Sequence, residues 1–187
     1  MNENVGVPRG RCSREPARRT YMELWDIYDR DKQRTGRTMK RNDWHMQPGD
    51  FHLTVLGVIR HTNGKYLITK RVMTKAWAPG SWEVSGGAAQ AGEDSLDAVK
   101  REIKEETGLE VTRTEFLFSL PNTYLYSGFL VHTVDCFFRC TVADSSLAHA
   151  MDDAAELLWI PVKELRPEDF GLASVRKGIE KLLVQWP

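Results

Sequence analysis

The chain has 187 residues, of which 41% are hydrophobic and 28% charged, enough for one globular domain of ordinary size and an additional segment. No apolar run approaches the roughly 18–20 residues of a membrane-spanning helix, so we expect no membrane partner. The 26 Lys and Arg residues balance the 26 Asp and Glu residues, and we expect no nucleic-acid partner either.

The first part of the chain is its most basic part. Residues 1–41 carry 11 Lys and Arg against 6 Asp and Glu, and residues 42–187 carry 15 against 20. A basic segment before an acidic body could indicate nucleic-acid contact, but we favour the interpretation of residues 1–19 as a flexible basic tail. This tail contains no hydrophobic stretch of the kind that a secretory signal requires. Cys12, Cys136 and Cys140 are too sparse for a disulfide framework and indicate a reducing compartment, which predicts a cytoplasmic protein.

Hydrophobic alternation predicts that strands come first. Residues 20–47 are predicted to form an N-terminal strand–turn–strand extension, and residues 48–187 the main domain. There, FHLTVLGVIR and KYLITKRV are predicted to pair as a hairpin across the Asn-Gly turn of HTNGK. Residues 73–87 then form a loop and a short strand that ends in two glycines. Further strands are predicted at 111–120, 129–142 and 155–162.

Two amphipathic helices are predicted in the main domain. Asp94 can cap the first and Gly108 can end it, with Leu96, Val99 and Ile103 as its buried stripe. The second covers residues 172–186, and its apolar side consists of Leu172, Val175, Ile179, Leu182 and Leu183. Together these elements predict an α/β (α+β) fold in which a mixed sheet is packed between helices.

The first helix carries an acidic cluster. Glu102, Glu105 and Glu106 are three and four apart, so a helix brings their carboxylates onto one face, where they repel each other. The cluster is either a solvated helix face or the site of a cation. Gly86 and Gly87 precede it and let the backbone approach another group closely. Carboxylates with a carbonyl nearby are the hard oxygen ligands that Mg²⁺ or Mn²⁺ prefers, and such ions also bind substrate phosphates.

The same segment resembles a family signature. From Gly87 to Leu109 it fits G-x5-E-x7-R-E-U-x-E-E-x-G-U, the box of the Nudix hydrolases, at all nine constrained positions over 23 residues. The resemblance implies a Nudix α/β/α sandwich and magnesium-dependent hydrolysis of a diphosphate linked to another moiety. It also implies site residues: metal ligands at Glu102, Glu105, Glu106 and the Gly87 carbonyl, Arg101 orienting a glutamate by ion pairing, and a box glutamate such as Glu105 or a later acid as base.

A fourth metal ligand or base often follows the box helix in this family. The candidates here are Asp152, Asp153 and Glu156. We favour Glu156, because Glu-x-x-Trp-Ile-Pro enters the last strand as in many Nudix proteins. The alternative is that Glu156 is an ordinary surface acid near a strand end.

The segment before the box resembles one branch of the family. ITKRVMTKAWAPGSW, the preceding His52-Leu53 and the strand at 24–29 are similar to type I isopentenyl diphosphate isomerase and its hydrolase relatives. This resemblance implies that Arg71 and Lys75 contact a diphosphate. It also places His52 at the position of a metal-site histidine of the isomerases.

The isomerase reaction itself is not expected. Gly86 and Ala88 occupy the positions of the isomerase's reactive cysteine and metal-binding histidine, and Val131 and Thr133 those of its later acids. A proton-shuttling enzyme without these groups lacks its acid and base.

Aromatic residues give a weaker indication of the substrate. SLPNTYLYS, ten residues past the box, partly matches the S-Q-P-W-P-F-P-x-S array of NADH pyrophosphatases, with Tyr124 in the aromatic place. Tyr124 could stack on a base and Trp77 could line the pocket, although both could equally be loop or core aromatics. The match favours an ADP-ribose-like or dinucleotide substrate.

The sequence therefore predicts a magnesium-dependent Nudix hydrolase that cleaves the pyrophosphate bond of a nucleoside diphosphate linked to another moiety. ADP-ribose, a nucleotide sugar or a dinucleotide would be its small-molecule partner, and the protein could be a homodimer. The alternative is a catalytically silent Nudix-fold module that binds nucleotides and regulates. The complete glutamate set favours the enzyme, because a silent module has no need of it.

Overall fold

The structure is a computed structural model that describes residues 23–185 except 42, 44, 76 and 127. The predicted basic tail lies outside the described residues. The described chain forms three sheets, ordered β1-β2, β6-β3-β8-β7 and β5-β4-β9. The strands are β1 (Leu24–Tyr28), β2 (Arg34–Lys40), β3 (His52–Ile59), β4 (Lys65–Arg71), β5 (Trp82–Glu83), β6 (Ser85–Ala88), β7 (Val111–Tyr126), β8 (Phe129–Val142) and β9 (Ala154–Pro161).

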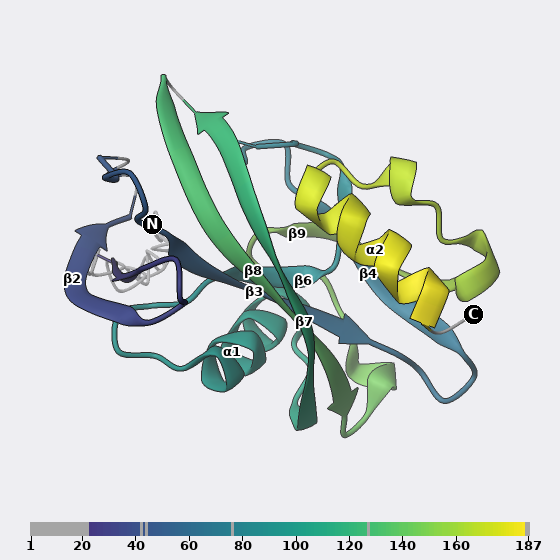
Figure 1. Cartoon of the computed structure of the whole chain (residues 1–187). Helices are drawn as coiled ribbons and strands as arrows, with labels where there is room; N and C mark the ends of the chain where they lie inside the picture. The colour runs from purple at the N-terminus through teal and green to yellow at the C-terminus, as the bar shows by residue number, and fades with distance from the viewer. Residues whose placement is uncertain (1–22, 42, 44, 76, 127, 186–187) are drawn as a thin grey trace, which may run out of the picture.

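The two helices lie on opposite sides of the sheets (Figure 1), α1 at Ser95–Thr107 and α2 at Ala173–Gln185. The four-stranded sheet is mixed, because β3 pairs with β8 in parallel and with β6 antiparallel. This arrangement confirms the predicted α/β/α sandwich. No helix in the described part of the chain is long and apolar enough to cross a membrane.

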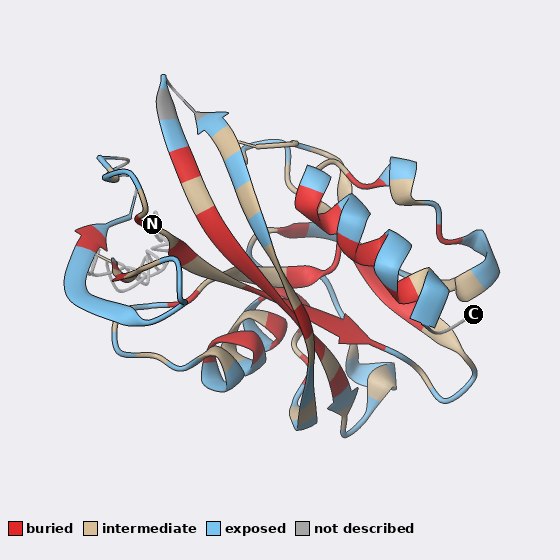
Figure 2. Ribbon diagram, viewed as in Figure 1, coloured by how far each residue is buried: buried red, intermediate tan, exposed pale blue. Residues whose placement is uncertain are grey.

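The core is built from strands that are buried on both faces. On β3, Val55 and Ile59 belong to the cluster under α1, whereas Leu56 and Val58 belong to the cluster under α2. Successive strand residues point to opposite faces, so both helices find apolar partners on this strand. Figure 2 shows the matching buried stripe along each helix. Burial of each such side chain contributes about 1.5–3 kcal/mol.

The ends of α1 follow the prediction. The Asp94 carboxylate accepts hydrogen bonds from the backbone N–H groups of Leu96 and Asp97, and Gly108 ends the helix in the left-handed conformation with φ 71°. The predicted stripe was wrong at Leu96, which is 42% exposed. The buried cluster under α1 includes Ala98, Val99 and Ile103 but not this first-turn side chain.

The predicted pairing of β3 with β4 was also wrong. The Asn-Gly turn connects them, but β4 pairs with β5 and β9, and the two strands share an isolated bridge at Arg60 and Tyr66. Both edges of β3 are occupied by β6 and β8, so β4 has no place beside it.

Two further segments differ from their prediction. The stretch containing Pro121 and Tyr124, expected in a loop, lies within β7, where Pro121 is tolerated because β7 is an edge strand. The glycines Gly86 and Gly87 lie inside β6 and pair with β3, instead of ending the strand.

β1 and β2, which we call the N-terminal hairpin (residues 24–40), confirm the predicted strand–turn–strand. The hairpin is attached to the rest of the chain by a bridge between Tyr28 and Phe51 and by the hydrogen bond from Ala91 N to Leu24 O at 2.7 Å. Its Trp25 stacks on His52 with ring centroids 4.7 Å apart. The division at residue 47 into an extension and a main domain remains a prediction.

Candidate active site

Arg101 is the centre of the acidic cluster on α1. Its guanidinium donates to both oxygens of Glu93, at 2.8 and 2.9 Å, to Glu102 at 2.7 Å and to Glu105 at 3.1 Å. It also donates to the Ala88 carbonyl at 3.2 Å, which ties the helix to β6. These contacts are compatible with the implied role of Arg101, orienting a glutamate by ion pairing, which remains a prediction.

The carboxylates around Arg101 differ in their ease of ionisation. Burial opposes ionisation of Glu93, but the hydrogen bonds from Arg101 and the Gln90 N–H outweigh it and hold the pKa of that carboxyl below its ordinary value. Burial raises the pKa of Glu102 to about 6 despite the attraction of Arg101. Burial, with the negative charges of Glu83 and Glu102, raises the pKa of Glu106 well above its ordinary value. Ionisation of Glu102 and Glu106 is therefore unfavourable in the fold unless a further cation lies beside them.

The paired glycines of β6 let these carboxylates reach the backbone. The N–H of Gly86 donates to Glu106 at 3.2 Å, and a Cβ at Gly87 would lie 2.6 Å from the Glu102 carboxylate. A Cβ at Gly86 would come within 2.1 Å of the Val55 carbonyl oxygen, so the isomerase's cysteine would not fit there. Gly86 therefore requires glycine because the backbone of β3 approaches it closely, and a side chain at Gly87 would displace the Glu102 carboxylate.

Glu83 is a site residue that the sequence did not indicate. It lies on β5, is buried, and forms an ion pair with Arg71. Burial raises its pKa in spite of Arg71, and its charge acts on Glu106. Glu83 is not part of any motif that the sequence shows. The one signal that could have indicated it is that it is a single acid between the apolar residues Trp82 and Val84.

Arg71 and Lys75 have different surroundings. Arg71 is buried, and besides Glu83 it donates to the Trp77 carbonyl at 2.9 Å, so it holds the loop that follows β4. Lys75 forms an ion pair with Asp153, and its charge acts on both Glu83 and Glu106. Lys75 thus lies beside the carboxylates, whereas contact of Arg71 with a diphosphate remains a prediction.

The later acid that lies near the cluster is Asp153. The loop before β9 is attached to the end of α1, because Met151 N donates to the Glu106 carbonyl at 2.9 Å. This connection brings Asp153 to Lys75 and near Glu83. Glu156 faces Lys70 at 3.3 Å with 53% of its side chain exposed. Sequence reasoning favours Glu156, and the geometry favours Asp153.

Trp77 and Tyr124 meet edge to face, with ring centroids 5.2 Å apart. Both pack against a cluster that includes Trp25 and Met39 of the N-terminal hairpin and Val131 of β8. Burial, together with the nearby charge of Asp135, raises the pKa of the Tyr124 hydroxyl. The predicted substrate-contacting aromatics are therefore together, in a partly apolar wall that the hairpin helps to form.

The donor set suits a hard divalent cation. Glu102, Glu105 and Glu106 offer carboxylate oxygens, and the absence of a Cβ at Gly87 leaves its backbone against Glu102. In the described residues no three His, Cys, Asp or Glu side chains are already converged on one point, since Glu102 and Glu105 point to Arg101. A cation in the cluster would compete with Arg101 for these two carboxylates and relieve the charge at Glu106.

Comparison with known sequences agrees with this geometry. The NUDIX domain family matches residues 50–182. A Nudix hydrolase of Listeria monocytogenes is 35% identical over 102 residues, which are 52% of this chain and 60% of the Listeria protein. The nucleoside triphosphatase NudI of Salmonella heidelberg is 26% identical over 128 residues, which are 65% of this chain and 90% of NudI.

Solved structures show the same fold at low identity. A protein of Deinococcus radiodurans has a TM-score of 0.65 at 17% identity and covers 85% of this chain and 98% of its own. The NUDIX domain of Shewanella oneidensis NrtR, complexed with ADP ribose, has a TM-score of 0.58 at 19% identity, with coverage of 73% and 89%. With the family match over more than half of its length, the chain belongs to the Nudix family.

Proposed function

We propose that the protein is a magnesium-dependent Nudix hydrolase that cleaves the pyrophosphate bond of a nucleoside diphosphate linked to another moiety. ADP-ribose, a nucleotide sugar or a dinucleotide is the proposed substrate class. The observation that carries this proposal is the convergence of Glu102 and Glu105 on Arg101, with Glu106 interacting with Glu102. Lys75 and the Trp77–Tyr124 pair lie on neighbouring elements.

Each residue has a role in this mechanism. Mg²⁺, or Mn²⁺ in its place, would neutralise phosphate charge and lower the pKa of the attacking water when bound to the three glutamates. Glu105, with 46% of its side chain exposed, can accept the proton of that water. The water oxygen then bonds to phosphorus as the P–O–P bond breaks, and the departing phosphate takes the electron pair. Arg101 keeps the carboxylates oriented during the proton transfer.

Lys75 and the aromatic pair bind the substrate in this proposal. The Lys75 ammonium would exchange Asp153 for a phosphate oxygen, and Tyr124 or Trp77 would stack on the base. The isopentenyl diphosphate isomerase-like branch implies a diphosphate contact at Lys75, and the interaction of Lys75 with Glu83 and Glu106 supports keeping that branch as part of the proposal. We also retain a cytoplasmic location and possible homodimerisation as expectations.

The test is turnover of a panel with and without magnesium, with products identified by mass spectrometry. The panel contains ADP-ribose, nucleotide sugars, dinucleotides and, because one relative is a nucleoside triphosphatase, nucleoside triphosphates. Reaction in heavy-oxygen water identifies the phosphorus that is attacked. Preferred cleavage of triphosphates would overturn the substrate class but keep the mechanism. Tight binding of one compound without turnover of any would favour the silent regulatory module.

A further inference from the structure

The N-terminal hairpin lies outside the region that matches the Nudix family, yet it is fixed to the segment that carries Glu93. Besides the Ala91–Leu24 hydrogen bond, Gly92 N donates to the Asp26 carboxylate at 2.9 Å, and Arg34 donates to the Glu93 carbonyl at 2.6 Å. Glu93 in turn holds Arg101. The hairpin is therefore attached to the wall of the carboxylate site.

Arg41 follows β2 directly and is paired with Glu23, which precedes β1. The Arg41 backbone N–H donates to the Glu23 carbonyl at 2.8 Å, and Nη1 contacts the Glu23 carboxylate at 2.7 Å. The other oxygen of that carboxylate accepts from the indole N–H of the buried Trp25 at 2.9 Å. Trp25 is stacked on His52, so Glu23 and through it Arg41 are anchored to the core.

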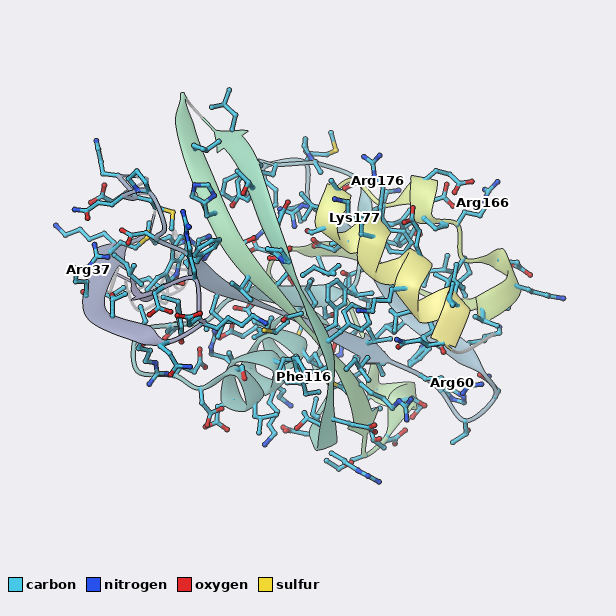
Figure 3. The ribbon with its side chains drawn as sticks, in the orientation of Figure 1. Arg37, Arg60, Phe116, Arg166, Arg176 and Lys177 are labelled. Carbon is cyan, nitrogen blue, oxygen red and sulfur yellow. The ribbon has the colours of Figure 1, made fainter. Side chains whose placement is uncertain are left out.

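The guanidinium of Arg41 lies within electrostatic range of the carboxylates of the site. It interacts electrostatically with Glu102 of the box helix and Asp153 of the loop before β9, and half of its side chain is exposed. Within the described part of the chain, its Nε and Nη2 have no hydrogen-bond partner, so two donor directions remain for a ligand. Other exposed cations, such as Arg166, Arg176 and Lys177, lie around α2, across the sheets from α1 (Figure 3).

We infer that Arg41 is a phosphate-binding residue of the substrate site, contributed by the N-terminal hairpin. Its guanidinium, which shares the neighbour Asp153 with Lys75, would bind the diphosphate of the substrate. An arginine presents a rigid pair of donors that suits two phosphate oxygens, and Glu23 fixes its orientation in advance. This inference rests on the proposed function and makes the hairpin part of the active site.

The test compares Arg41→Gln with the wild type and with Lys40→Gln, which removes a neighbouring exposed charge from the end of β2. For the best substrate of the panel, Arg41→Gln should raise KM by about tenfold or more and change kcat less, since a charge-assisted hydrogen bond is lost. The inhibition constant of inorganic pyrophosphate should rise by a similar factor, whereas that of the free nucleoside should stay within twofold (about the error of such constants). Arg41→Lys should recover part of the loss.

Several outcomes would overturn the inference. Unchanged KM and pyrophosphate inhibition in Arg41→Gln would show that Arg41 does not contact phosphate. An equal weakening of nucleoside inhibition, or an equal effect of Lys40→Gln, would assign the change to the hairpin as a whole. If the wild type hydrolyses nothing, the proposed function fails separately, and calorimetric binding of pyrophosphate to the wild type and Arg41→Gln still decides the role of Arg41.

Discussion

Replacing Glu102 with glutamine in metal-free protein should stabilise the fold, and the gain should grow with pH. Burial raises the pKa of Glu102 from 4.5 to about 6, so between these values the folded protein keeps a proton that the unfolded chain has lost. The stability that Glu102 contributes to the wild type is therefore fully present below pH 4.5 and is lost as the pH rises through 6. At about 1.4 kcal/mol per unit, the loss is about 2 kcal/mol, and the attraction of Arg101 is already contained in that net shift.

The assay is urea unfolding in EDTA at half-unit steps from pH 4.5 to 7.5. Glu102→Gln should come close to the wild type at pH 4.5, where the Glu102 carboxyl of the folded protein is protonated, and exceed it by about 2 kcal/mol at pH 7. Glu180→Gln, which changes an exposed glutamate on α2, should show no such trend. Taking differences between variants removes the pH dependence of the groups that do not interact with Glu102.

Saturating magnesium should reverse the order, because ligand binding stabilises the folded protein that binds it more tightly, here the wild type. A gain that is independent of pH would refute the reasoning, since it would come from packing instead of ionisation. If Glu102→Gln is less stable than the wild type in EDTA at pH 7, the ionised Glu102 stabilises the fold through its ion pair with Arg101, and the reasoning is wrong.

Three further predictions concern the site and its surroundings. Glu105→Gln or Glu106→Gln should lower kcat by about 100-fold or more with unchanged circular dichroism, and activity within a few-fold of wild type would contradict the placement of the site. Gly87→Ala should displace the Glu102 carboxylate, which a Cβ would approach to 2.6 Å, and reduce kcat/KM about tenfold or more with little change in Tm. Burial lowers the pKa of His52 to about 4, so its contribution to stability should fall by about 3 kcal/mol as pH falls from 6.5 to 4. In urea unfolding, the stability of the wild type relative to His52→Gln should fall by this amount over that range.

The parts of the site that were predictable from the sequence are local along the chain. A capping aspartate, a terminal glycine and carboxylates three and four apart define α1 and its acidic face without reference to any other element. The packing of Arg101 among Glu93, Glu102 and Glu105 follows from the same spacing.

The parts that were not predictable depend on distant partners. Glu83 joins the site because β5 brings it near Glu106, and nothing in its own neighbours indicates this. Asp153 is placed by the hydrogen bond between its loop and the end of α1. This contact is not visible in the sequence, where Glu156 was favoured because it begins the Glu-x-x-Trp-Ile-Pro motif. The pairing of β3 depends on β6 and β8, which occupy its two edges. The Asn-Gly turn after β3 carries no information about these strands.

The parallel pairing of β3 with β8 has a consequence for the order of events in folding. His52 pairs with Thr133, about eighty positions later, whereas β7 and β8 are joined by a short turn. Closing such a long loop is slow, so we expect the β7–β8 hairpin to form first and the joining of β3 to limit the folding rate. Since α1 packs on β3, the carboxylates come together only after that barrier. Magnesium should therefore leave the folding rate unchanged and slow unfolding instead.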